Sequence, residues 1–176
     1  MAITASIQEF LRQANVAYRV VPHLPAYTAR EEAAVAHVPR RDWAKTVICF
    51  ADGEAIEAVV PADRVVNLKS LAAAAGAWTI RLAREDELDS LFPDCEAGAM
   101  PPFGPLYQQP VFVDQSLAHE DDEEHIVFNA GTHTDAVAMR YRDFAALTHP
   151  IVARIGQRRP ADRFELASSG DLDNQC

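Results

Sequence analysis

The stretch TVICFADGEAIEAVV, residues 46–60, decides the central element of the fold. Two apolar runs, one rich in β-branched residues, flank the dipeptide Asp52-Gly53. Asp-Gly is favoured in two-residue hairpin turns, because both turn positions need a positive φ that few other residues tolerate. The stretch therefore predicts an antiparallel β-hairpin.

The segments outward from this hairpin alternate between helix and strand signals without a fixed order. Thr28 and Glu31 form a capping box that opens a short helix before the hairpin. After it, Asn67 is placed to cap a helix over 68–75, and Gly76 stands where a helix-ending glycine belongs. We expect further strands over 16–21, 78–82, 111–113, 126–129 and 136–139, and further helices over 6–14, 85–92 and 141–147. This mixture predicts a mixed α/β fold of the α+β kind, a curved mixed β-sheet surrounded by helices, and not a doubly wound sheet.

Length and composition indicate one folded domain. The 176 residues are 49% hydrophobic and 24% charged, typical of a globular chain. We expect the domain to span residues 1–156, and the polar, aperiodic residues 157–176 to form a flexible C-terminal tail. No secretion signal, membrane span or CxxC pair is visible in the sequence, so a cytoplasmic protein without a membrane partner is expected.

The charge pattern restricts the kinds of partner. The net charge is −10, and residues 120–124 are five consecutive acidic residues. A DNA-binding protein is not expected, because duplex binding needs an extended basic surface. The basic residues form small groups that leave room for a local patch binding one RNA end: Arg40, Arg41 and Lys45; Arg140 and Arg142; and Arg154, Arg158 and Arg159.

Three places in the chain could carry chemistry. Lys45 stands at the mouth of the first hairpin strand, where an ammonium can meet an anionic or carbonyl group, although a lysine that merely snorkels at a strand edge is the alternative. The loop GAMPPFG, residues 98–104, combines glycines that let backbone N–H groups approach a ligand with prolines that fix them in place. The alternative for this loop is a crossover whose prolines block edge pairing.

The third place is the stretch NAGTHT, residues 129–134, which ends a predicted strand with small and hydroxyl residues. It could open a pocket or form a plain turn, and His133 could serve as a general base. The sequence contains no HExxH, GxSxG, GxGxxG or phosphate-loop motif. We therefore expect no metal and no cofactor.

Four motifs in this order resemble the YbaK/prolyl-tRNA synthetase-associated domain family: AKTV at 44–47, AVVP at 58–61 with NLK at 67–69, GAMPPFG at 98–104, and FNAG at 128–131. The likeness covers about residues 4–150. Members are trans-acting editing proteins, or domains inserted in prolyl-tRNA synthetase, that hydrolyse amino acids wrongly attached to tRNA. The resemblance also implies a curved sheet surrounded by helices.

The resemblance assigns roles to individual residues. Lys45 matches the main functional residue of the family, and the family's G-x-x-x-P loop, matched by Gly98 to Pro102, lies against the aminoacyl ester. The backbone N–H groups of Gly98, Ala99 and Met100 could stabilise an oxyanion there. Because the ester is already activated, a protein base is not required. Met100, Val47 and Phe103 are expected near a size-selective pocket. The remaining expected substrate contacts are Thr46, Pro101, Pro102, Asn129 (where some relatives have serine), Gly131, Thr132 and His133.

The function that follows from the resemblance is an aminoacyl-tRNA deacylase acting in trans on a small mischarged amino acid, with tRNA-Pro as the expected tRNA. Its expected partners are the mischarged acceptor end and prolyl-tRNA synthetase. Alanine, cysteine, serine and threonine all remain open as the edited amino acid. Two alternatives are a non-catalytic module that binds the acceptor end or a small ligand, and a structural or regulatory protein using residues 120–124.

Overall fold

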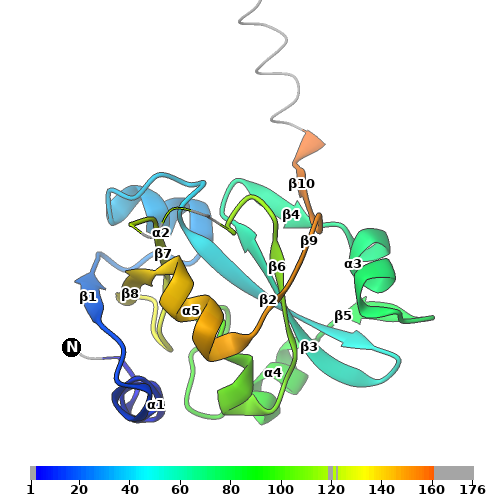
Figure 1. Cartoon of the computed structure of the whole chain (residues 1–176), viewed down its shortest axis with the longest axis horizontal. Helices are drawn as coiled ribbons and strands as arrows, with labels where there is room; N and C mark the ends of the chain where they lie inside the picture. The colour runs from blue at the N-terminus through cyan, green and yellow to red at the C-terminus, as the bar shows by residue number, and fades with distance from the viewer. Residues whose placement is uncertain (1–2, 119–120, 122, 161–176) are drawn as a thin grey trace, which may run out of the picture.

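The computed structural model describes residues 3–118, 121 and 123–160, arranged as Figure 1 shows. Glu120 and Asp122 of the acidic segment lie outside the described residues, as do residues 161–176 of the expected tail.

The predicted hairpin is confirmed and forms the middle of the molecule. Strand β2 (Ala44–Ala51) pairs antiparallel with β3 (Glu54–Pro61) along their whole length. Asp52 and Gly53 have φ values of 48° and 88°, the positive values that the Asp-Gly turn requires. The hairpin therefore forms for the local reason that the sequence indicates.

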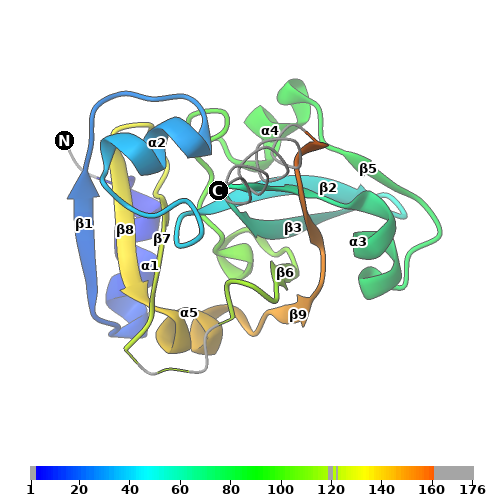
Figure 2. The ribbon, with the colours of Figure 1, turned by 90° about the horizontal axis from the view of Figure 1, so that it is seen from above.

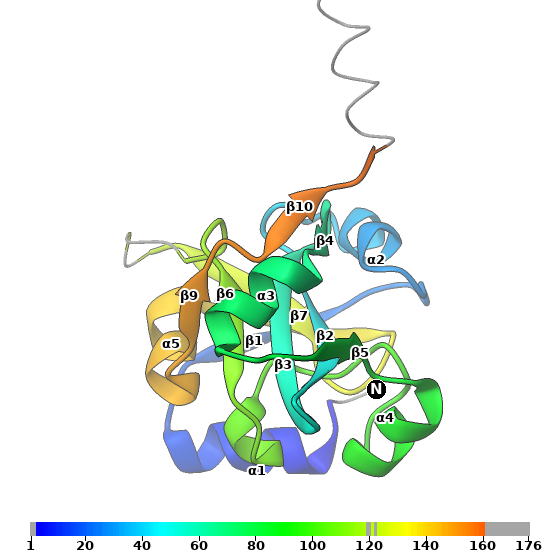
Figure 3. The same cartoon turned by 90° about the vertical axis from the view of Figure 1, so that its right-hand side faces the viewer.

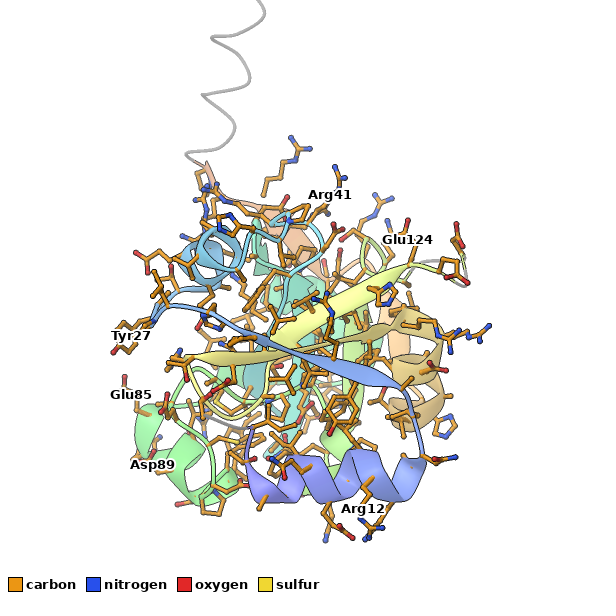
Figure 4. All side chains as sticks on the ribbon, turned by 90° about the vertical axis from the view of Figure 1, so that its left-hand side faces the viewer. Arg12, Tyr27, Arg41, Glu85, Asp89 and Glu124 are labelled. Atoms are coloured by element: carbon orange, nitrogen blue, oxygen red, sulfur yellow. The ribbon has the colours of Figure 1, made fainter. Side chains whose placement is uncertain are left out.

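Three further strands extend the hairpin into a five-stranded sheet of order β5-β2-β3-β6-β9: β5 (Ile80–Leu82), β6 (Val111–Asp114) and β9 (Ile151–Ala153). β6 runs parallel to β3, and β9 runs parallel to β6, so the sheet is mixed. Helix α3 (Leu68–Ala75) lies against one face of this sheet (Figure 3). It begins at Asn67, whose Oδ1 accepts a hydrogen bond from the Ser70 amide at 3.0 Å, and it ends at Gly76 with φ 63°, both as predicted.

A second, three-stranded sheet lies beside the first (Figure 2) and has the order β1-β8-β7: β1 (Tyr18–Pro22), β8 (Asp135–Arg140) and β7 (His125–Asn129). The two sheets meet where Trp43, just before β2, forms a parallel bridge with Val127 of β7. The Val127 amide donates to the Asp42 carbonyl at 3.2 Å. The predicted curved mixed sheet is thus realised as two sheets joined at the start of β2.

Helices α1 (Ala5–Ala14) and α5 (Tyr141–Thr148) contribute to the largest core cluster, which contains residues from both sheets. Phe103 lies at its centre with no exposed surface, and its ring meets Phe128 edge-on at 5.1 Å between centroids. Phe10 and Phe144 pack against it from α1 and α5. This aromatic cluster fixes the loop that contains Phe103 against the body of the protein.

The remaining elements lie around the sheets: α2 (Ala29–Val35), α4 (Glu85–Leu91), the short 3-10 helix η1 (Gly104–Tyr107), and a small sheet of β4 (Arg64–Val66) and β10 (Gly156–Arg158). β10 includes Gln157 and Arg158, the first two residues of the expected tail. Within the described part of the chain, no helix is long and apolar enough to cross a membrane.

Candidate functional site

A cavity of about 110 Å³ lies where the three predicted segments meet. Its walls come from α2, the start of β2, the loop after α4 and the end of β7. The lining residues are Ala29, Glu32, Trp43, Ala44, Lys45, Thr46, Gly98, Met100 and Asn129. The structure therefore brings together five predicted site residues, Lys45, Thr46, Gly98, Met100 and Asn129, from places up to 84 positions apart in the sequence.

Lys45 is half-buried at this cavity, and its electrostatic environment changes its protonation. Burial, together with the nearby charges of Arg159 and Arg30, lowers the pKa of its ammonium from 10.5 to about 8, while the charge of Asp63 acts in the opposite direction. An ammonium that gives up its proton this readily is poorly solvated. It gains most from an anionic or carbonyl oxygen placed beside it.

The Gly/Pro loop presents its backbone to the same cavity. Gly98 has φ 86°, a conformation that glycine adopts at little cost. Its N–H group points to the sulfur of Met100 at 3.3 Å, a weak acceptor that a ligand oxygen can replace. The described residues provide no acceptor for the Met100 amide, whereas the Ala99 amide already donates to the Glu96 carbonyl at 2.9 Å. Two of the three predicted amides are therefore available to a ligand, and that of Ala99 is not.

Two buried side-chain oxygens at the cavity have no hydrogen-bond partner among the described residues, Thr46 Oγ1 and Asn129 Oδ1. Buried polar atoms are almost always paired, because an unpaired one costs about 1–3 kcal/mol. Both atoms belong to residues that line the same small cavity. This combination indicates a site that completes its hydrogen bonds with a polar ligand.

Glu32, which the sequence interpretation missed, organises one wall of the cavity. Its Oε1 accepts from Asn129 Nδ2 and from His133 Nδ1, both at 2.7 Å, and the side chain is almost fully buried. The signal was present in the sequence: on α2, Glu32 interrupts the apolar face formed by Ala29, Ala33 and Ala36 at helical spacing.

His133 is held at both ring nitrogens. Nδ1 donates to Glu32, and Nε2 donates to the Ala97 carbonyl at 2.8 Å. Both partners are acceptors, so both nitrogens carry protons. Burial alone would lower the pKa of His133, but the bonds to Glu32 and Ala97 outweigh it, and the pKa is raised. An imidazolium with both N–H groups engaged fastens the loop and is not available as a base.

Gly131 and Thr132 lie beside the cavity, where their hydrogen bonds hold the loops in place. Gly131 N donates to the Ala99 carbonyl at 2.9 Å, and its carbonyl accepts from the Glu96 amide at 2.8 Å, which pins the two loops together. Thr132 Oγ1 lies within hydrogen-bond distance of Asp135 and accepts from its amide. Neither residue is among those described as lining the cavity.

Several other expected contacts lie away from the cavity lining. Phe103 belongs to the aromatic core, and Pro101 and Pro102 are buried beside it. These three residues anchor the loop to the core and are not among those that line the cavity. Val47 packs against the opposite face of the five-stranded sheet, in the cluster that includes α3. Because side chains alternate along a strand, Thr46 and Val47 cannot face the same side. Of the expected selectivity residues, Met100 alone lies at the cavity.

The fold and this site together define a mixed α/β domain with one small polar cavity between a lysine and a glycine-containing loop. Residues 23–147 match the family model of the aminoacyl-tRNA editing domain. The chain belongs to this family, as the resemblance of its motifs predicts.

Two curated proteins illustrate the relationship. The multifunctional Ser/Thr-tRNA deacylase ProXp-y of Escherichia coli (strain K12) is 28% identical over 144 residues, which is 80% of this chain and 84% of the relative. A proline–tRNA ligase of Anaeromyxobacter sp. (strain Fw109-5) is 35% identical over 118 residues. That match covers 67% of this chain but only 20% of the much longer ligase.

Solved structures share the fold. The crystal structure of a putative trans-editing enzyme for prolyl tRNA synthetase superposes with a TM-score of 0.72 at 20% identity, covering 89% of this chain and 99% of that chain. A hypothetical protein of known crystal structure gives a TM-score of 0.75 at 24% identity, covering 86% and 99% of the two chains. At these identities the superpositions establish the architecture.

Proposed function

We propose that the protein is an aminoacyl-tRNA deacylase that acts in trans and releases a small, wrongly attached amino acid. The observation that carries the proposal is the cavity in which Lys45, two available loop amides and two unpaired side-chain oxygens meet. Membership in the editing-domain family and the E. coli deacylase support the same activity.

The chemistry requires little from the protein beyond placement and charge. Water adds to the ester carbonyl, the bond between the carbonyl carbon and the ribose oxygen breaks, and the ribose hydroxyl is restored as the amino acid leaves. The carbonyl oxygen gains negative charge on the way. The amides of Gly98 and Met100 and the Lys45 ammonium are the groups that stabilise it. His133 is engaged at both ring nitrogens and does not act as the base. We therefore assign the positioning of the water to the neighbouring ribose hydroxyl.

The cavity favours a small amino acid with polar atoms. The buried Glu32 side chain and Asn129 Oδ1 are acceptors suited to the substrate's amino group. Thr46 Oγ1 remains for a side-chain hydroxyl. We therefore infer that serine and threonine are released faster than alanine, and the E. coli relative, a Ser/Thr-tRNA deacylase, supports this inference.

A panel of mischarged tRNAs tests the proposal. tRNA-Pro carrying serine, threonine, alanine, cysteine or proline is incubated with the protein, with Lys45→Ala and with buffer. The expected result is rapid release of at least one small amino acid, slow release of proline, and loss of release in Lys45→Ala with an unchanged circular dichroism spectrum. A panel in which no ester is cleaved faster than in buffer would overturn the proposal.

Thr46→Val tests the inference about the hydroxyl group. Valine keeps the shape of threonine but removes the unpaired Oγ1. A neutral hydrogen bond contributes about 1 kcal/mol, so we expect the preference for seryl over alanyl esters to fall about fivefold, with alanine release unchanged. The measurement is the ratio of kcat/KM for seryl-tRNA and alanyl-tRNA. An unchanged ratio would remove Thr46 from selectivity.

The choice of tRNA-Pro and an association with prolyl-tRNA synthetase belong to this proposal and are supported by the 35% identical segment of the Anaeromyxobacter ligase. The engagement of both His133 nitrogens favours one alternative, a module that binds the acceptor end without cleaving it. Saturable binding of seryl-tRNA-Pro without any release of serine would establish that alternative.

A further inference from the structure

A second cavity, of about 250 Å³, opens on the face of the five-stranded sheet that α3 covers. We call it the apolar groove, and Figure 3 shows β2, β5, β4 and α3 around this region. Its lining residues are Lys45, Val47, Val65, Val66, Leu68 and Leu82. Leu82 is 52% exposed and the other apolar lining residues are half-buried, so a ligand can reach the groove from solvent.

Lys45 joins this groove to the polar cavity, because it lines both. On β2, Val47 shares the face of Lys45, while Thr46 faces the other side. A ligand whose reacting bond lies at Lys45 can therefore place a small polar group on one side and a flat apolar group on the other. The cavity at Thr46 is polar and the groove at Val47 is apolar, so each matches one end of such a ligand.

The proposed substrate has this construction. Its ester joins a small amino acid to a ribose, and the ribose carries an aromatic base. An apolar groove with one cation at its edge suits a base, whose faces stack or pack on side chains while its phosphate remains near positive charge. Arg30 and Arg159 are the positively charged residues that interact electrostatically with Lys45, and Asp63 is the negatively charged one.

We propose that the apolar groove binds the base of the terminal adenosine of tRNA while the amino acid occupies the polar cavity. This inference rests on the proposed function. The lining side chains Val47, Val65, Val66, Leu68 and Leu82 have no polar groups, so the contact is one of packing and not of hydrogen-bonded base reading. A packing contact suffices to bind this base, because every tRNA ends in the same nucleoside and the groove does not have to distinguish it from other bases.

Competition between small ligands and tRNA tests the groove. Adenosine 5′-monophosphate and ribose 5-phosphate are compared as inhibitors of seryl-tRNA-Pro deacylation, since they differ only in the base. We expect the adenosine nucleotide to inhibit at a concentration at least about tenfold lower than ribose 5-phosphate does, which is the range of a single base contact. Leu82→Asp should remove this difference. The control is Val152→Asp, at a 47% exposed position on the opposite edge strand of the same sheet, which should keep it.

The outcomes separate this inference from the proposed function. If no tRNA of the panel is deacylated, the proposed function fails and the base site fails with it. If seryl-tRNA-Pro is cleaved but the two inhibitors are equally effective, or if Leu82→Asp leaves their difference unchanged, only the base site is overturned. Equal inhibitors, together with a dimer that Leu82→Asp dissociates in sedimentation, would assign the groove to a second copy of the chain.

Discussion

Lys45 loses its charge close to physiological pH, and this makes its role measurable. Burial, with Arg159 and Arg30, lowers the pKa of its ammonium to about 8, so the charged fraction falls as the pH rises through that value. Uncatalysed ester hydrolysis becomes faster over the same range. We therefore expect the ratio of catalysed to uncatalysed deacylation to decline above pH 8.

The matched variant is Lys45→Arg, because a guanidinium stays charged throughout this range. Whatever activity Lys45→Arg retains should lack the decline above pH 8. A ratio for the unchanged protein that stays constant up to pH 9.5 would show that the charge of Lys45 does not take part in the reaction.

His133 should contribute to stability in its charged form. Its pKa is raised in the folded protein, so its contribution is complete below the unfolded pKa of about 6.5 and is lost as the pH rises through the folded value. We expect His133→Ala to lower the free energy of unfolding by about 2 kcal/mol at pH 6 and by less at pH 9. Denaturant unfolding at the two pH values measures this.

The control for His133 is His125→Ala, because His125 is exposed at the start of β7 and its ring bonds to the Glu123 carbonyl two residues earlier. It should change stability little at either pH. Hydrogen exchange adds a second readout: residues 96–100 should exchange faster in His133→Ala, since the bond to Ala97 is gone. Unchanged exchange there would show that His133 does not fasten the loop.

Which residues lie at the cavity was predictable from the sequence where the residue type itself is informative, and was not predictable where the direction of a side chain decides. The Gly98 loop and Lys45 were found because glycine, proline and a strand-mouth lysine are informative by type. The placement of Val47 and Phe103 was not, since alternation along a strand does not reveal which face meets the site. Glu32 escaped because its partners, Asn129 and His133, are about 100 positions away.

At the scale of elements, the loop containing Gly131 lies closely against Thr4, the residue that precedes α1. Gly131 has φ 93°, and a Cβ added there would lie 2.3 Å from Thr4 Cγ2. We expect Gly131→Ala to lower the free energy of unfolding by about 3 kcal/mol, from backbone strain together with the clash. Thermal or denaturant unfolding measures the change.

Gly53→Ala measures the free-energy cost of the backbone strain alone, without the clash. Gly53 has a similar φ of 88° but nothing within 4 Å of the added Cβ. It should cost only the strain of the left-handed conformation, about 1 kcal/mol. Equal losses in the two variants would mean that the contact with Thr4 adjusts without cost and does not fix the loop.

Elements with local signals were predicted closely, and elements without them were not. The hairpin and α3 carry their own turn and caps, and the structure confirms both. The strands β4, β9 and β10 have three residues each, and each pairs with a strand distant in sequence or forms an edge. Three residues contain no periodicity, so the partner supplies the structure and the sequence alone does not indicate it.

At the scale of the whole molecule, Glu57 places a carboxyl group inside the fold. It lies on β3 with no exposed surface, and neither side-chain oxygen has a hydrogen-bond partner among the described residues. Burial raises its pKa well above the ordinary value, although the nearby Gly104 amide opposes the shift. The folded protein therefore keeps a proton that the unfolded chain releases above about pH 4.5.

This linkage makes stability fall as the pH rises from the unfolded pKa of Glu57 towards its folded pKa. Glu57→Gln has nearly the same shape and no proton to lose. We expect the variant to gain stability relative to the unchanged protein between pH 5 and pH 8, by denaturant unfolding at several pH values. A difference that does not vary with pH would show that Glu57 is ionised within the fold.

The central claim is that Lys45 and the loop amides at one small cavity cleave an aminoacyl ester. The most direct test is the first-order rate of serine release from seryl-tRNA-Pro at pH 7 with the protein, with Lys45→Ala and with buffer. We predict a rate with the protein at least about 100-fold above buffer, and a Lys45→Ala rate close to buffer. Identical release in all three samples, or full activity in Lys45→Ala, would contradict the account.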